Sequence, residues 1–163
     1  MSMAPQPLLQ VDQLRISVRG AQGFHPVVRE LSFSVDAGQT LAIVGESGCG
    51  KSITALSILG LLPRGSARVD SGRILFEGTD LLRQPESAMR ALRGNQIAMI
   101  FQEPMTSLNP VLTVGAQIAE AVSVHRGVPG REAWNLAIES LERVRMPDAP
   151  RRCLLYTSDA ADE

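Results

Sequence analysis

The chain has 163 residues and a formal net charge of −1, with 44% hydrophobic and 20% charged residues. This length and composition are typical of about one soluble globular domain, and the near-neutral charge gives no reason to propose nucleic acid as a partner. No apolar run approaches the roughly 18 residues of a membrane-spanning helix. The two cysteines provide neither a disulfide framework nor the spacing of metal ligands.

The first part of the chain predicts an antiparallel sheet. Residues 8–18 and 27–35 alternate apolar and polar side chains, as half-buried strands do. Residues 40–44 form a short apolar run that predicts a third strand. Turn residues separate the three segments at 20–23 and 36–38. Strands joined by such short turns favour antiparallel pairing.

A glycine-rich segment and a helix come next. Residues 45–50 contain three glycines, and residues 51–62 are apolar on most sides, which predicts a buried helix. Beyond this helix, residues 73–76 predict a strand and residues 86–93 a short polar helix.

The last part of the chain predicts one buried strand and two helices. Residues 97–101 are a continuous apolar run, consistent with a buried parallel strand. Two prolines stiffen the loop over residues 102–110. Residues 114–124 and 131–144 then predict helices, the second with a clear apolar face.

The most specific pattern lies in residues 45–52, GESGCGKS, which match G-x-x-x-x-G-K-S/T in full. The glycines allow successive backbone N–H groups to point inward around an anion, and the following helix adds its positive N-terminal dipole. Lys51 is the single lysine among 16 basic residues. A compact ammonium suits a tight phosphate nest better than the planar guanidinium of arginine does.

These properties predict a phosphate-binding loop for a nucleotide. Lys51 is expected to reach the β- and γ-phosphates of ATP, and the Ser52 hydroxyl is expected to bind Mg²⁺. The expected nucleotide-binding residues form one continuous run: Gly45, Glu46, Ser47, Gly48, Cys49, Gly50, Lys51, Ser52 and Ile53. The loop alone does not identify the class of protein that uses the nucleotide.

Three longer segments resemble the ATP-binding subunits of ABC transporters. They read LSFSVDAGQTLAIVGESGCGKS, SGRILFEGTDLL and RGNQIAMIFQEPMTSLNPVLTVGAQIAEAV, in this order along the chain. Within that family they look most like the importers of dipeptides, oligopeptides, glutathione and nickel. The resemblance spans about residues 8–152. It implies an α/β fold: a P-loop NTPase core with an N-terminal antiparallel β subdomain and the start of a helical subdomain (about residues 105–150), incomplete at the C-terminus.

The resemblance also assigns roles to single residues. It implies that Gln102 is the glutamine of the family's Q-loop, which together with Ser52 organises Mg²⁺ and the attacking water. Lys51 and Gln102 are then the catalytic residues of this chain. The family places an aromatic residue near the end of the first strand, against adenine. Val18 stands there in this chain, which leaves Phe24 and His25 as substitutes to consider.

The family implies particular partners and a location. We expect membrane-spanning permease subunits, which would meet residues 104–110, and a second ATP-binding subunit in a homo- or heterodimer. An extracytoplasmic solute-binding protein would act indirectly. The chain has no secretory signal, so the expected location is the cytoplasmic face of the cell membrane, as a peripheral subunit.

The family's signature segment, its acidic Walker B strand and its switch histidine do not occur in this sequence. The chain by itself is therefore expected to bind nucleotide without hydrolysing it. Two alternatives remain open: a non-catalytic fragment that binds nucleotide weakly or fails to fold, and a P-loop protein of another class. A guanine-specific GTPase is disfavoured, because the chain has no N-K-x-D motif and no second lysine.

The final eleven residues, CLLYTSDAADE, do not continue the preceding pattern. They resemble the translation of a transposase-type sequencing adapter, whose codons TGT CTC TTA TAC ACA TCT encode Cys-Leu-Leu-Tyr-Thr-Ser. We therefore hypothesise that residues 1–152 are native and residues 153–163 are not. The alternative is a genuine C-terminal segment. Re-sequencing the locus with flanking DNA decides between them, and a natural stop codon after Glu163 would contradict the adapter hypothesis.

Overall fold

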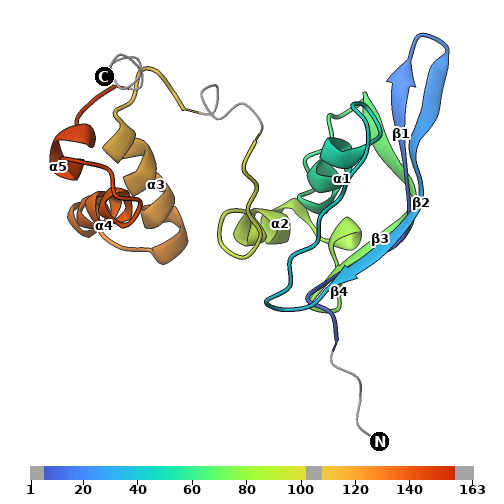
Figure 1. The fold of residues 1–163 in the computed structure, drawn as a ribbon, viewed down its shortest axis with the longest axis horizontal. Coiled ribbons are helices and arrows are strands. Elements are labelled where there is room, and N and C mark those ends of the chain that lie inside the picture. The colour runs from blue at the N-terminus through green and yellow to red at the C-terminus, as the bar shows by residue number, and fades with distance from the viewer. Residues whose placement is uncertain (1–5, 102–107, 157–163) are drawn as a thin grey trace, which may run out of the picture. The chain divides into compact units, whose positions relative to one another are not determined.

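The computed structural model describes residues 6–101 and 108–156. The chain divides into two compact units, Met1–Arg93 and Gly94–Glu163. Figure 1 shows a sheet with helices in the first unit and helices in the second. Each unit is described by itself.

The first unit is built on a four-stranded sheet with the order β2-β1-β3-β4. Its strands are β1 (Leu9–Gly20), β2 (Gly23–Val35), β3 (Ala67–Phe76) and β4 (Thr79–Asp80), and every pairing is antiparallel. The tight turn predicted at residues 20–23 closes the β1–β2 hairpin, where Gly20 pairs with Gly23. The predicted antiparallel sheet is therefore confirmed, with β3 rather than residues 40–44 beside β1.

Helix α1 (Lys51–Ile58) lies over one face of this sheet (Figure 1). A short 3-10 turn, η1 (Leu81–Arg83), and helix α2 (Glu86–Leu92) follow β4. Alternation along β1 and β3 turns apolar side chains of the sheet inward. Those at most 6% exposed are Val11, Leu14, Ile16, Val28 and Ile74, and Leu59, Leu81 and Met89 outside the sheet are at most 5% exposed.

Two predicted strands are wrong for this chain. Residues 40–44 and 97–101 have no strand assignment, although their apolar runs predicted buried strands. Val44 is 89% exposed and Ile100 is 91% exposed. A strand requires a neighbouring backbone for its hydrogen bonds. Among the described residues, only an isolated bridge at Ile97 involves either run, and neither run joins the sheet.

The second unit contains α3 (Val114–Arg126), α4 (Gly130–Arg143) and α5 (Ala149–Arg152). The Thr113 hydroxyl accepts a hydrogen bond from the Ala116 N–H and caps the start of α3. Gly127, with φ of 64°, ends this helix. Ala119, Ala133 and Ala137 form a small core between α3 and α4. The two helices predicted for this region are confirmed.

Residues 153–156 pack onto this helical unit. The Cys153 side chain is fully buried beside Leu141 and Ala149, and the Leu155 carbonyl accepts a hydrogen bond from the Val114 N–H at 3.0 Å. This packing does not test whether the residues are native, so the adapter origin of residues 153–163 stays a prediction. No helix in the described residues is both long and apolar enough to cross a membrane.

Candidate functional site

The candidate site lies at the beginning of α1, directly after the glycine-rich turn. Gly50 is the N-cap of α1 in a left-handed conformation, with φ of 98° and ψ of 4°. Gly48 also has a positive φ, of 82°. Side chains with a Cβ adopt this region at a cost. The two glycines therefore serve the turn itself, as the motif predicted.

The N-terminus of α1 is open to an anion. No side chain caps the helix, and its first turn contains no acidic residue. The first N–H groups of a helix have no partner within the helix, and together they carry a partial positive charge. A phosphate group would satisfy these donors and gain from the helix dipole.

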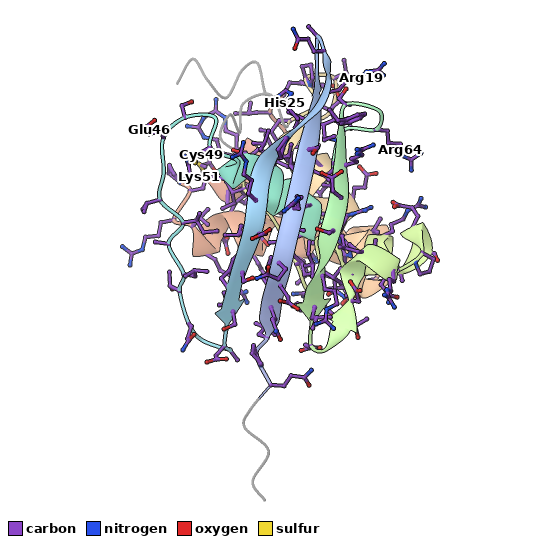
Figure 2. All side chains as sticks on the ribbon, turned by 90° about the vertical axis from the view of Figure 1, so that its right-hand side faces the viewer. Arg19, His25, Glu46, Cys49, Lys51 and Arg64 are labelled. Carbon is purple, nitrogen blue, oxygen red and sulfur yellow. The ribbon has the colours of Figure 1, made fainter. Side chains whose placement is uncertain are left out.

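The Lys51 side chain folds back over the loop that precedes it. Its Nζ donates hydrogen bonds to the carbonyl oxygens of Gly45 at 2.6 Å and Glu46 at 2.7 Å, and it lies 3.5 Å from Cys49 Sγ. Two carbonyl acceptors fix the ammonium at the mouth of the turn. The third proton of the ammonium is donated to Cys49 Sγ in this structure, and sulfur is a weak acceptor that a phosphate oxygen would replace. Figure 2 labels Lys51 together with Glu46 and Cys49 of the same loop.

Small side chains allow the loop to close. A Cβ on Gly45 would lie only 2.6 Å from Cys49 Sγ. A Cβ on Gly50 would lie 2.8 Å from Val28 Cγ2, so the loop rests directly on β2. Gly48 has open space around it. The structure thus brings the ends of the loop together and seats the loop on the sheet.

Thr54 and Ser57 support the start of α1, and the sequence pattern did not single them out. The Thr54 hydroxyl donates to the Gly50 carbonyl at 2.8 Å, and the Ser57 hydroxyl donates to the Thr54 carbonyl at 2.7 Å. Both residues are about 2% exposed. Such bonds to the helix's own carbonyls are common for buried Ser and Thr, and no local pattern distinguishes these two residues.

The remaining expected site residues have different outcomes. Ser52 and Ile53 lie in the first turn of α1, with Ser52 exposed. Gln102 lies outside the described residues, as does most of the predicted loop over residues 102–110. The roles of Lys51, Ser52 and Gln102 toward ATP and Mg²⁺ remain predictions. An exposed hydroxyl beside a lysine at an open helix N-terminus does fit a nucleotide phosphate with its magnesium ion.

Three features together are the arrangement of a P-loop protein. They are the glycine-rich turn, the uncapped N-terminus of α1, and the lysine whose ammonium group is bonded to carbonyl oxygens of the turn. The family model described as "ABC transporter" matches residues 28–159. The chain belongs to the ABC transporter family. The matched range ends inside the segment 153–163 and leaves the origin of that segment undecided.

Curated relatives support this placement. A protein of Brucella abortus (strain 2308) that carries the name peptide import ATP-binding protein is 48% identical over 159 residues, covering 94% of this chain and 47% of the relative. A peptide ABC transporter ATP-binding protein of Sinorhizobium fredii is 51% identical over 149 residues, covering 91% and 44%. The chain thus spans about half the length of the curated relatives it matches.

Solved structures resemble the fold as well. The ATP-binding cassette MJ0796, in a dimeric post-hydrolysis state bound to ADP and Pi, superposes with a TM-score of 0.76 at 18% identity. The match covers 91% of this chain and 61% of that one. A second dimeric structure of MJ0796, described as a bacterial ABC transporter cassette, gives a TM-score of 0.75. These likenesses confirm the α/β P-loop fold class predicted from the sequence.

Proposed function

We propose that this chain is part of the ATP-binding subunit of an importer for peptides or peptide-like solutes, and that residues 45–53 hold the phosphates of ATP with Mg²⁺. The observation that carries the proposal is the open N-terminus of α1 behind the Gly45–Gly50 turn, with Lys51 Nζ held on the Gly45 and Glu46 carbonyls. The names of the curated relatives support peptide import.

Different residues of the loop are proposed to bind different parts of Mg-ATP. The glycines leave the backbone N–H groups accessible to phosphate oxygens, and Lys51 adds a positive charge at their entrance. Ser52 supplies an oxygen for Mg²⁺, which neutralises phosphate charge when it is bound. Gln102 is proposed to complete the metal site and to orient the attacking water.

Hydrolysis and transport are proposed for the whole protein. There, the transporter would also contain a second ATP-binding subunit and membrane-spanning permease subunits. The ATP-binding subunits would lie at the cytoplasmic face of the membrane, and a solute-binding protein would deliver the solute. The chain of 163 residues is proposed to bind nucleotide only. Its turnover of ATP is therefore expected to equal that of its Lys51→Ala variant.

The experiment measures binding of Mg-ATP and of inorganic tripolyphosphate to the 163-residue chain by titration calorimetry. Lys51→Ala removes a charge-assisted contact to phosphate, and we expect it to weaken both ligands about 10- to 100-fold. Arg143→Ala is the matched control, because it removes one positive charge from α4 in the other unit.

Equal affinities for Lys51→Ala and the unmodified chain would contradict the proposed phosphate site. Preferential binding of GTP over ATP would contradict ATP as the proposed nucleotide.

A further inference from the structure

Three residues with a left-handed backbone lie at one level of the sheet, one in each of three neighbouring strands. They are Glu30 of β2, Gln13 of β1 and Gly72 of β3, with φ of 54°, 48° and 101°. The pairing of β1 with both of its neighbours shifts register at this level, and Figure 2 shows the three strands side by side. We call these three residues the bulge line, because strand bulges occur where the register shifts.

Side-chain contacts and a close approach of two backbones hold the bulge line. The Gln13 N–H donates a hydrogen bond to the Ser32 hydroxyl at 2.8 Å, and Arg15 forms an ion pair with Glu30 at 2.7 Å. A Cβ on Gly72 would lie 2.6 Å from the Gln13 carbonyl oxygen, so β3 approaches β1 this closely only with glycine there. Glutamate and glutamine adopt a positive φ at a cost, and non-glycine residues held at such a cost cluster at functional sites.

The bulge line changes which side chains of β2 face inward. In a regular strand, residues two positions apart share a face. In β2, the half-buried Leu31 and the buried Val28 are three positions apart. The reason is that β2 has two residues, Arg29 and Glu30, where β1 has only Arg15. With regular pairing, Arg29 would take the inward position that Val28 occupies.

Val28 is the residue on which the phosphate loop rests. A Cβ on Gly50 would lie 2.8 Å from Val28 Cγ2, so the backbone of the loop is already in contact with this valine. Gly50 is the N-cap of α1, and the next residue, Lys51, is held on two carbonyl groups of the loop. An arginine side chain beneath Gly50 would be longer and charged, and the loop would have to move away from the sheet to admit it.

We propose that Glu30 and Gln13 are positioning residues of the phosphate site. Their left-handed backbone keeps Val28, rather than Arg29, beneath the phosphate loop. Neither side chain touches the ligand. The inference rests on the proposed function of the loop and concerns how the sheet fixes the backbone N–H groups that receive the phosphates. Affinity then depends on the fraction of the chain whose register is correct.

The test is the affinity for inorganic tripolyphosphate, measured by titration calorimetry on the 163-residue chain. Glu30→Val should weaken binding about tenfold, because a β-branched residue resists a positive φ and the bulged register becomes less populated. Glu30→Gly should have the affinity of the unmodified chain, because glycine adopts a positive φ freely. This rescue occurs without the ion pair to Arg15, so it separates the backbone from the charge.

Glu77→Val is the matched control. Glu77 is also an exposed glutamate with a positive φ, of 48°, but it lies in the turn between β3 and β4. Its substitution by valine should destabilise the fold to a similar degree in urea unfolding and leave the tripolyphosphate affinity unchanged. If Glu30→Val does not fold, Gln13→Val and Gln13→Gly make the same comparison in β1.

A second substitution tests the register itself. If the affinity falls because Arg29 takes the place of Val28, Arg29→Val should restore it in the Glu30→Val chain, since a valine again lies beneath the loop. Arg29→Val alone should leave the affinity nearly unchanged, because Arg29 is exposed in the native register.

Unchanged tripolyphosphate binding in a folded Glu30→Val chain would overturn the proposal, as would an equal loss in Glu77→Val. Weak binding by Glu30→Gly would overturn it too, because the ion pair and not the backbone would then matter. Failure of Arg29→Val to repair the Glu30→Val chain would show that Val28 is not the link. If the unmodified chain binds tripolyphosphate, the phosphate site stands whichever of these results is found; if it does not, both proposals fail.

Discussion

The Arg93 side chain donates a hydrogen bond from Nε to the Leu59 carbonyl oxygen at 2.7 Å, just past the last turn of α1. The same guanidinium bonds the Gly60 carbonyl and forms an ion pair with Glu86 at 2.6 Å. Arg93 therefore closes the C-terminal end of the helix whose N-terminal end carries the phosphate loop. It supplies a donor where a helix leaves carbonyls unpaired and where a positive charge is favoured.

The first prediction concerns this contact. Arg93→Ala should lower the free energy of unfolding by about 1–2 kcal/mol, because it leaves the carbonyl groups at the end of α1 without their donor. Arg90→Ala, one turn earlier on α2, removes the same charge without these bonds and should change stability by less. Urea unfolding followed by circular dichroism measures both. An equal loss in the two variants would show that charge, not capping, matters.

The second prediction is the pH dependence of the Arg93–Glu86 pair. The hydrogen bond from Arg93 holds the pKa of Glu86 below its ordinary value of 4.5. A carboxylate whose pKa is lower when folded stabilises the fold above its unfolded pKa and loses that effect as pH falls through the folded pKa. The stability difference between the unmodified chain and Glu86→Gln should thus be present at pH 7 and shrink below about pH 4.5. A difference that grows on acidification would contradict this.

Local pattern was enough to predict β1 and β2, because half-buried strands alternate. It was not enough for β3, which begins at Ala67 rather than at residue 73. The early part of β3 is polar, and its position depends on partners far away in sequence: Asp12 pairs with Arg73 through a 2.7 Å ion pair. Cross-strand partners of this kind leave no periodic signal in either strand alone.

In the candidate site, too, local pattern predicted some features, and packing between distant segments determined the others. The loop over residues 45–52 is contiguous, so its pattern could be recognised directly. The contact of Val28 with the loop and the cap from Arg93 both come from other elements. These depend on register and tertiary packing, which the sequence pattern did not specify.

The third prediction separates two glycines of the loop. Gly48→Ala should cost about 1–2 kcal/mol, because alanine is strained at positive φ. Gly50→Ala should cost about 2–4 kcal/mol, since its methyl group would also meet Val28, a stiff β-branched side chain. Thermal unfolding of the two variants compares them directly. In the Gly50→Ala background, Val28→Ala should cost less than it does alone; additive losses would argue against the clash.

The fourth prediction concerns the two apolar runs that form no strand. Val44→Thr and Ile100→Thr should each change the stability of this chain by at most about 0.5 kcal/mol, since both side chains are about nine-tenths exposed. Both should reduce self-association, because exposed apolar segments with unpaired backbone promote it. Light scattering and urea unfolding provide the two readouts. Ile74→Thr in the buried sheet is the control and should be strongly destabilising. A loss of about 2 kcal/mol in Val44→Thr would mean that this segment is buried after all.

The fifth prediction uses the two cysteines as reporters of the two units. Cys49 is exposed in the phosphate loop and Cys153 is buried, and burial raises the pKa of the Cys153 thiol. Thiolate is the reactive form, so a chromogenic thiol reagent at pH 8 should modify Cys49 quickly and Cys153 only on unfolding. Cys49→Ser should abolish the fast phase.

The same reaction reports ligand at the phosphate loop. Inorganic tripolyphosphate should slow labelling of Cys49 in the unmodified chain, because the bound anion would cover the turn in which the thiol lies. In Lys51→Ala this protection should be lost at the same ligand concentration. Two fast thiols in the native chain would show that Cys153 is accessible, while equal protection in both chains would place the anion elsewhere. Since Cys153 reports on the second unit, its slow phase also measures how firmly residues 153–156 are held there.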